Sequence, residues 1–285
     1  MNNILDGGAR AAIAAAVIVA AALCSAPAAL AKTATSSNWA GYAVHRPGVS
    51  FRQVSGTWTQ PSAVCVAGQS TYSAAWVGVG GFKPTSAALE QIGTEVDCEP
   101  GGNAVSTAWY ELVPAPSKTI SLAVHPGDVM HATVTVVGNR VTVVLENLTS
   151  HRTFRRSRYA PSVDVSSAEW IVEAPSECVS QFACQALALA YFGSVTFDSA
   201  RATSTTGTAG SITAPTWWRT KIELTPVAQR VILARQTSYS AGAATPSSLR
   251  GAGREFDVTY SPVAVAPQQF SATRQSRLRA GYVEH

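Results

Sequence analysis

Short segments rich in Val, Thr, Trp and Tyr recur along most of this 285-residue chain, and they constrain its fold more than any other feature. Gly, Pro, Asn and Ser separate these segments, which is typical of strands joined by turns. No helical periodicity of convincing length follows the apolar N-terminus. The pattern predicts an all-β fold, a β-sandwich of two antiparallel sheets. The expected strands cover residues 51–59, 72–79, 108–113, 132–137, 141–145, 168–172, 194–197, 221–224, 231–234 and 255–260.

The segments between these strands indicate one folded domain. Gly138-Asn139-Arg140 separates two alternating segments and predicts a hairpin. Residues 202–214 and 238–253 are rich in small and hydroxylated side chains, and we expect both to be surface loops. Residues 266–285 form a polar tail with little to pack. We therefore expect a single β-sandwich domain over residues 32–265.

The N-terminus is typical of a secretory signal peptide. Arg10 precedes an apolar run over residues 11–23, and Ala29-Leu30-Ala31 provides a small-x-small cleavage site. A membrane anchor is the alternative, but the apolar run is too short to span a bilayer comfortably. We expect residues 1–31 to be removed and the mature chain to be secreted, with no membrane contact afterwards.

Cysteine usage agrees with export. Removal of the signal leaves an even number of cysteines, which favours disulfides in an exported chain. Sequence alone allows three pairings. No Cys-x2-Cys pair and no His-Glu-x-x-His motif occurs, so we expect no metal site. The four cysteines are Cys65, Cys98, Cys178 and Cys184.

Composition limits the classes of protein that remain. Apolar residues make up 46% of the chain, enough for a sizeable core, whereas only 13% are charged. So few carboxylates predict good resistance to acid unfolding. The net charge is +4 and the longest basic run is residues 151–156, so we expect no nucleic-acid partner.

Three segments each place a carboxylate beside an apolar or amide side chain. Because side chains alternate across a strand, residues two apart share a face. One interpretation is a solvated outer face, which needs no function. The other is an acidic, aromatic-lined groove in which repulsion raises the pKa of at least one carboxyl group. The sets are Glu169, Ile171 and Glu173; Trp109 and Glu111; and Gln91 and Glu95.

Eight short blocks spread over residues 36–262 add a more specific signal. They are SNWAGY at 37–42, VSGTW at 54–58, AWVG at 75–78, EQIG at 90–93, WYE at 109–111, LENLT at 145–149, AEWIVE at 168–173 and FGSVTF at 192–197. In composition and order they resemble the glutamic peptidase (eqolisin) family. Each block alone is weakly specific, but the ordered series is highly specific.

The resemblance implies a β-sandwich with a substrate groove on one concave face, and a metal-independent acid endopeptidase that needs no cofactor. By the same resemblance Glu173 is the general base that activates a water. Gln91 holds that water and stabilises the oxyanion through its amide. Protein or peptide substrates are expected, and we expect a monomer.

The resemblance also implies roles for residues around the pair. Trp76, Glu95, Trp109 and Glu111 are expected to line the groove, and Glu177 lies close to Glu173 in sequence. We expect the disulfides Cys65–Cys98, whose segments flank the Gln91 strand, and Cys178–Cys184, which are close in sequence.

Some residues depart from the family pattern. Gly80 stands where the family often has Asp, and Glu95 is one methylene longer than the Asp of the family. Pro175 and Ser176 replace an aromatic and an acidic residue, so the specificity pocket differs. The basic pI favours a less extreme pH optimum.

Two other functions use the same residue types. A lectin-like β-sandwich binds carbohydrate with Trp and carboxylates but needs no pairing of Gln91 with Glu173. A glycosidase could use two carboxylates such as Glu111 and Glu173. Hydrolysis of a protein rather than a polysaccharide separates these possibilities from a peptidase.

Overall fold

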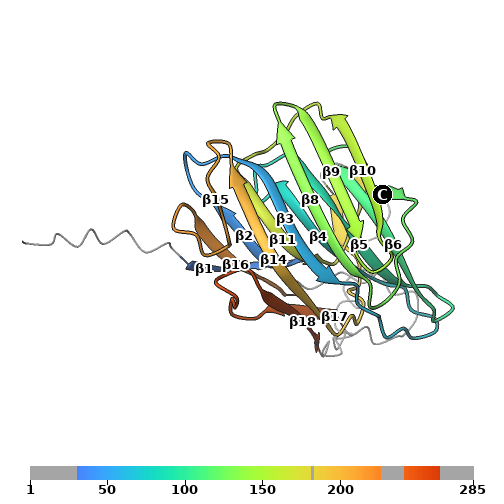
Figure 1. Ribbon diagram of the computed structural model, residues 1–285. Coiled ribbons are helices and arrows are strands. Elements are labelled where there is room, and N and C mark those ends of the chain that lie inside the picture. The colour runs from blue at the N-terminus through green and yellow to red at the C-terminus, as the bar shows by residue number, and fades with distance from the viewer. Residues whose placement is uncertain (1–30, 181–182, 226–240, 264–285) are drawn as a thin grey trace, which may run out of the picture.

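The computed structural model describes residues 31–180, 183–225 and 241–263, and this part of the chain is built from strands alone (Figure 1). No helix in it is long and apolar enough to cross a membrane. The strands are β1 (Ala31–Ser36), β2 (Trp39–His45), β3 (Phe51–Thr59), β4 (Thr71–Gly80), β5 (Leu89–Cys98), β6 (Ala104–Leu112), β7 (Lys118–Ile120), β8 (Val129–Val137), β9 (Arg140–Asn147), β10 (Arg152–Tyr159), β11 (Ser167–Glu173), β12 (Ser176–Ser180), β13 (Ala183–Ala186), β14 (Ser194–Ser204), β15 (Ala209–Gly210), β16 (Trp218–Leu224), β17 (Ala241–Pro246) and β18 (Phe256–Val263).

The strands form two packed layers, as the all-β prediction requires (Figure 1). The first layer runs β10-β9-β8-β3-β14-β18 and the second runs β16-β2-β11-β4-β5-β6-β7. β17 pairs with both β18 and β16, so the two expected sheets are joined into one hydrogen-bonded path. Pairing is antiparallel except between β1 and β16, which run parallel. β12 and β13 form a separate hairpin.

The core lies between the two layers because alternate side chains of both turn inward. Trp58 of β3 and Phe197 of β14 enter it from the first layer, and Trp170 of β11 enters from the second. All three side chains are fully buried. The Trp170 indole N–H donates to the backbone oxygen of Ser55 at 2.8 Å, which ties the two layers together.

Most of the expected strands are confirmed, several with longer bounds. The hairpin predicted around Gly138 is formed by β8 and β9, and Gly138 has a φ of 55°, which glycine adopts readily. The expected strand at 231–234 lies outside the described residues, as do residues 1–30 and 264–285. The bounds of the signal, the domain and the tail therefore stay predictions.

Both predicted loops were partly wrong. β14 continues to Ser204, and β17 lies inside the range 238–253. Strand pairing uses backbone groups, so a run of small residues still forms a strand when it lies between two others, as β17 does. The basic run at 151–156 is also mostly strand, because β10 pairs with β9 over residues 152–159.

The predicted disulfide between Cys65 and Cys98 is confirmed, with a Cα–Cα distance of 5.3 Å. It joins the segment after β3 to the end of β5. The backbone register of the β12–β13 hairpin places Cys178 opposite Cys184. A disulfide between these two residues stays a prediction.

Candidate active site

One face of the second layer turns away from the core and collects acidic, amide and indole side chains. It is formed by β2, β11, β4, β5 and β6, whose cross-strand pairs put the side chains on a common side. None of these five strands contains Lys or Arg. We call this surface the acidic face, and its polar and aromatic members are Trp39, Trp76, Gln91, Glu95, Asp97, Trp109, Glu111, Glu169 and Glu173.

Indole rings form the apolar base of the acidic face. Trp76 of β4 and Trp109 of β6 both pair with Gly93 of β5, so the strand between the two rings carries no side chain. They belong to a second buried apolar cluster, separate from the main core. Trp39 packs edge-to-face on Trp76 with ring centroids 5.1 Å apart.

Glu173 is the last residue of β11. It accepts hydrogen bonds from a side chain of β4 and from a side chain of the turn between β1 and β2. Trp76 Nε1 donates to Glu173 Oε2 at 2.8 Å. Asn38 Nδ2 donates to Glu173 Oε1 at 3.0 Å, and Ser36 Oγ donates to Asn38 Oδ1 at 3.1 Å. Both carboxyl oxygens therefore have a fixed partner, while the residue remains partly exposed.

Burial raises the pKa of Glu173 to about 7, because a charged carboxylate loses water there. The negative charge of Glu111 raises this pKa further. The indole N–H groups of Trp76 and Trp39 and the amide of Asn38 act in the opposite direction, since they stabilise the ionised form. A proton on Glu173 is therefore exchanged close to neutral pH.

Gln91 is buried in β5, and its amide has one partner. Its Nε2 donates to Glu111 Oε2 at 2.7 Å, while its Oε1 has no hydrogen-bond partner in the described part of the chain. Burial raises the pKa of Glu111, and the hydrogen bond from Gln91 moderates that rise. The carboxyl of Glu111 thus orients the amide of Gln91 and leaves its oxygen available as an acceptor.

Gln91 and Glu173 lie on the same face but in different rows of the sheet. Gln91 pairs with Gly78 of β4 and Glu173 pairs with Ala74, so Trp76 lies in the row between them. The Glu173 carboxyl accepts a hydrogen bond from the indole of Trp76 in that middle row. No hydrogen bond joins the two directly among the described residues, and Glu111 is the group that interacts with both.

The other predicted site residues differ in whether they lie on the acidic face and in how exposed they are. Glu95 lies on the acidic face and accepts a short hydrogen bond from Thr107 Oγ1. Trp76 is fully buried, whereas Trp109 keeps a small exposed area. Glu177 is exposed in the β12–β13 hairpin, and no contact in the described residues brings it to the acidic face.

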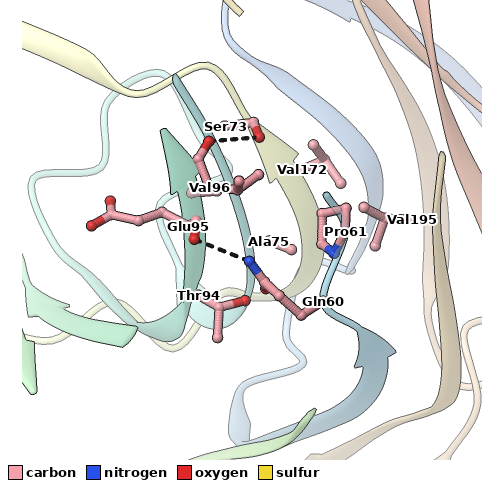
Figure 2. A pocket seen from close by; sticks show the side chains of 10 residues that line it. Gln60, Pro61, Ser73, Ala75, Thr94, Glu95, Val96, Val172 and Val195 are labelled. Carbon is pink, nitrogen blue, oxygen red and sulfur yellow. Dashed lines mark hydrogen bonds between the residues drawn. The ribbon is translucent and has the colours of Figure 1, made fainter. Parts of the chain in front are cut away.

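A narrow space on the opposite side of the second layer does not belong to this site. Gln60, Thr94 and Val195 line it between the layers, and Gln60 Nε2 donates to the backbone oxygen of Glu95 at 3.0 Å (Figure 2). The Glu95 carboxyl points away from this space (Figure 2). The side chain of Glu95 therefore lies on the acidic face, while its backbone oxygen accepts a hydrogen bond on the core side.

Gly80 has a structural reason for departing from the family pattern. Its φ is +87°, and a Cβ atom there would lie 2.3 Å from the backbone oxygen of Asp164. The Asp164 carboxylate accepts from Gly81 N at 3.2 Å and from Ser86 Oγ at 2.6 Å. An acidic residue from the segment before β11 thus occupies the space beside this position.

Sequence reasoning assigned no role to Asn38 and Trp39, although both contribute to the environment of Glu173. Both lie in the SNWAGY block, which the sequence identified. The sequence did not indicate that the side chains of this block face Glu173. Glu169 was expected beside Glu173, and it is fully buried with no hydrogen-bond partner for either oxygen in the described residues. No group of three or more His, Cys, Asp or Glu side chains there is arranged to hold a metal ion.

A β-sandwich in which one sheet face carries a buried amide, indole donors and carboxyl groups with raised pKa values has the equipment of a carboxyl-dependent hydrolase. The peptidase A4 family model matches residues 37–241. The chain is 32% identical over 200 residues to aspergillopepsin-2 of Aspergillus niger, which covers 61% of this chain and 67% of that protein.

Two solved structures agree with this match. One is scytalido-glutamic peptidase with a peptide-based transition-state analogue, which has a TM-score of 0.57 and 25% identity over 79% of this chain and 98% of that one. SCP-B, a member of the eqolisin family of peptidases in complex with the tripeptide Ala-Ile-His, has a TM-score of 0.55 and 26% identity over the same shares. The chain belongs to the peptidase A4 family, the glutamic peptidases or eqolisins, and is a glutamic endopeptidase.

Proposed function

We propose that this endopeptidase is secreted and hydrolyses peptide bonds by direct attack of a water that Glu173 and Gln91 activate. One observation supports this most. The carboxyl of Glu173 and the amide of Gln91 share the acidic face, each is oriented by hydrogen bonds from or to its neighbours, and Gln91 Oε1 has no partner among the described residues. The apolar N-terminal run and the Cys65–Cys98 disulfide support export to an oxidising compartment.

In the proposed reaction the ionised Glu173 removes a proton from the water, and the water oxygen bonds to the carbonyl carbon of the substrate. The carbonyl oxygen becomes an oxyanion, and an N–H of Gln91 stabilises it. Glu173 then gives its proton to the amine nitrogen as the C–N bond breaks. A carboxylic acid and an amine leave, and Glu173 is ionised again without an acyl-enzyme.

The neighbours of the pair divide into two proposed roles. Trp76 is fully buried and bonds to Glu173, so we assign it to positioning that carboxyl rather than to substrate contact. Trp109, Glu95 and Glu111 lie on the acidic face and are assigned to the substrate groove. Glu177 keeps the role of a peripheral substrate contact, which its exposure permits.

The general base has to be ionised, so activity depends on the pKa of Glu173. A value of about 7 places the rise of activity in the weakly acidic to neutral range. On acidification the proposed enzyme therefore loses activity at a less acidic pH than it would if the pKa of its base were low.

Glu173→Gln tests the mechanism. Loss of a general base lowers kcat by about 10²–10⁴-fold, so this variant should leave a denatured protein substrate almost intact between pH 3 and 7. Circular dichroism checks that the variant is folded. A folded Glu173→Gln protein with near-normal proteolysis would rule out the proposed base.

Glu169→Gln is the matched control, because Glu169 lies two positions along the same face of the same strand. We expect a milder effect, since no proton transfer is assigned to it. Digestion is run with and without a chelator. A wild-type protein that binds polysaccharide and leaves protein uncut would favour the lectin-like alternative instead.

A further inference from the structure

The net positive charge of the whole chain is found on one hairpin. The β9–β10 hairpin, residues 140–159, contains five arginines and one glutamate. The complete chain has 21 Lys and Arg against 17 Asp and Glu, so the other residues carry 16 of each sign and are neutral together. The formal charge of +4 therefore belongs to this hairpin.

Four of these arginines lie on β10 and are exposed. Among the residues that the structure describes, none of them forms a salt bridge. The one acidic residue of the hairpin, Glu146, pairs across the ladder with Thr153. We call these four side chains the arginine edge: Arg152, Arg155, Arg156 and Arg158.

β10 is the edge strand of the first layer (Figure 1). In the described part of the chain it pairs only with β9, so its other side offers free backbone N–H and C=O groups. The strand is nonetheless fixed in place. Phe154 stacks on Tyr110 of β6 at 5.9 Å between centroids, and the Arg140 guanidinium lies 4.6 Å from the centre of the Tyr159 ring.

The arginines lie on both sides of this edge. Side chains alternate along a strand, so Arg156 and Arg158 share one face, about 7 Å apart, and Arg155 lies on the other. Charges on an edge strand normally prevent another strand from pairing with it. A polypeptide with acidic side chains at alternate positions removes that repulsion and can use the free backbone groups as well.

The acidic face offers no cation to such a polypeptide. Its five strands contain no Lys or Arg, so an acidic stretch of a protein substrate finds positive side chains at β10 instead. Such a substrate is held away from the carboxyl groups while a less acidic segment reaches them.

We propose that the arginine edge docks acidic stretches of protein substrates, which add to β10 as an extra strand. The free backbone edge supplies the main-chain hydrogen bonds, and the arginines select Asp and Glu at alternate positions. A polysaccharide or a nucleic acid would use the charge but not the backbone edge. The proposal rests on the proposed peptidase function for its substrate, but its binding step does not require catalysis.

Binding is measured with the Glu173→Gln protein, which does not consume the probe, and a fluorescent ten-residue peptide of alternating Glu and Thr. Replacing all four arginines of the edge by Gln should weaken binding about tenfold or more, as measured by fluorescence anisotropy at low salt. The matched control replaces four exposed cations elsewhere, which removes the same net charge. This control variant should bind the peptide as tightly as the parent protein does. The four replaced cations are Arg52, Lys83, Arg201 and Arg254.

Two further probes separate the possible ligands. The same peptide with alternate amide nitrogens methylated should bind about tenfold more weakly, because it cannot complete the strand pairing. Unchanged binding of the methylated peptide, tighter binding of heparin than of the peptide, or equal binding by the arginine variant would each overturn the proposal.

A cleavage experiment separates this proposal from the proposed function. In the active protein, a Glu-Thr tail on a peptide substrate should lower KM with kcat unchanged, and the arginine variant should lose that difference. Absence of all cleavage with binding intact contradicts only the peptidase mechanism. Cleavage that ignores both the tail and the arginine variant contradicts only the docking site.

Discussion

At the scale of single residues, the protonation of Glu173 depends on groups that face it from other strands. Trp76 and Asn38 stabilise its ionised form through hydrogen bonds, whereas burial and the charge of Glu111 oppose ionisation. Gln91 meanwhile is oriented by Glu111. The same carboxyl therefore holds the amide and tunes the base.

Glu111→Gln should lower the pKa of Glu173, because it removes a nearby negative charge but keeps an acceptor for Gln91. The acidic limb of the kcat/KM profile should move to lower pH. A pH–rate profile of the purified variant beside wild type measures the shift. An acidic limb that stays in place, or moves to higher pH, would show that Glu111 does not act on the base.

Asn38→Ala provides the opposing change. It deletes a donor to Glu173 Oε1, so the pKa of Glu173 should rise and the acidic limb should move to higher pH. Opposite shifts in the two variants would be difficult to obtain from general loosening of the fold. Shifts in the same direction would contradict the proposed environment of Glu173.

At the scale of elements, β5 depends on a residue without a side chain. Gly93 lies between Trp76 and Trp109, and a Cβ there would be 2.3 Å from the backbone oxygen of Ala75. The neighbouring atom belongs to the backbone of β4, so it cannot move without disturbing the ladder. The glycine lets both indole rings occupy the acidic face.

Gly93→Ala should therefore destabilise the fold by about 1–3 kcal/mol through overpacking. Thermal unfolding measures it, with Tm expected to fall by about 2–4 °C per kcal/mol in a chain of this size. Gly101→Ala is the control, because the nearest atom to a Cβ there is 3.4 Å away. Equal Tm values for the two variants would mean that the close approach of β4 and β5 is unimportant.

At the scale of the whole molecule, buried carboxyl groups outside the proposed reaction limit stability at neutral pH. Glu90 and Glu169 are fully buried, and none of their four oxygens has a hydrogen-bond partner among the described residues. Burial, together with the charge of Asp164, raises the pKa of Glu90 to about 8. Burial is also the main reason that the pKa of Glu169 is well above its usual range.

These pKa shifts determine whether the free energy of unfolding rises or falls with pH. In the unfolded chain such groups lose their protons near pH 4.5, whereas folded Glu90 keeps its proton until about pH 8. Between these values the folded state binds more protons, so the free energy of unfolding decreases as pH rises. Each such group contributes a slope of about 1.4 kcal/mol per pH unit.

Glu90→Gln should make this slope shallower by up to about 1.4 kcal/mol per pH unit, because the amide does not titrate. Urea unfolding at intervals from pH 4.5 to 8 measures it. Glu99→Gln, at an exposed glutamate, is the control and should keep the wild-type slope. A Glu90→Gln slope equal to that of wild type would show that Glu90 is not the titrating group.

The sequence by itself determined the strands and which residues share a face. Glu169 with Glu173, and Trp109 with Glu111, follow from alternation, because side-chain direction in a strand depends only on even or odd position. The ordered blocks that resemble the eqolisins singled out Gln91 as a candidate, because it lies in the EQIG block. Local residue order is sufficient for these features.

Only the tertiary structure decided what surrounds each of those side chains. Glu169 and Glu173 share a face, yet one is fully buried and the other remains partly exposed. Asn38 reaches Glu173 across 135 residues of sequence, and the basic run of β10 becomes a free edge only through the order of the strands. Burial, hydrogen-bond partners and pKa depend on contacts between segments far apart in the chain, and alternation within one strand carries no information about them.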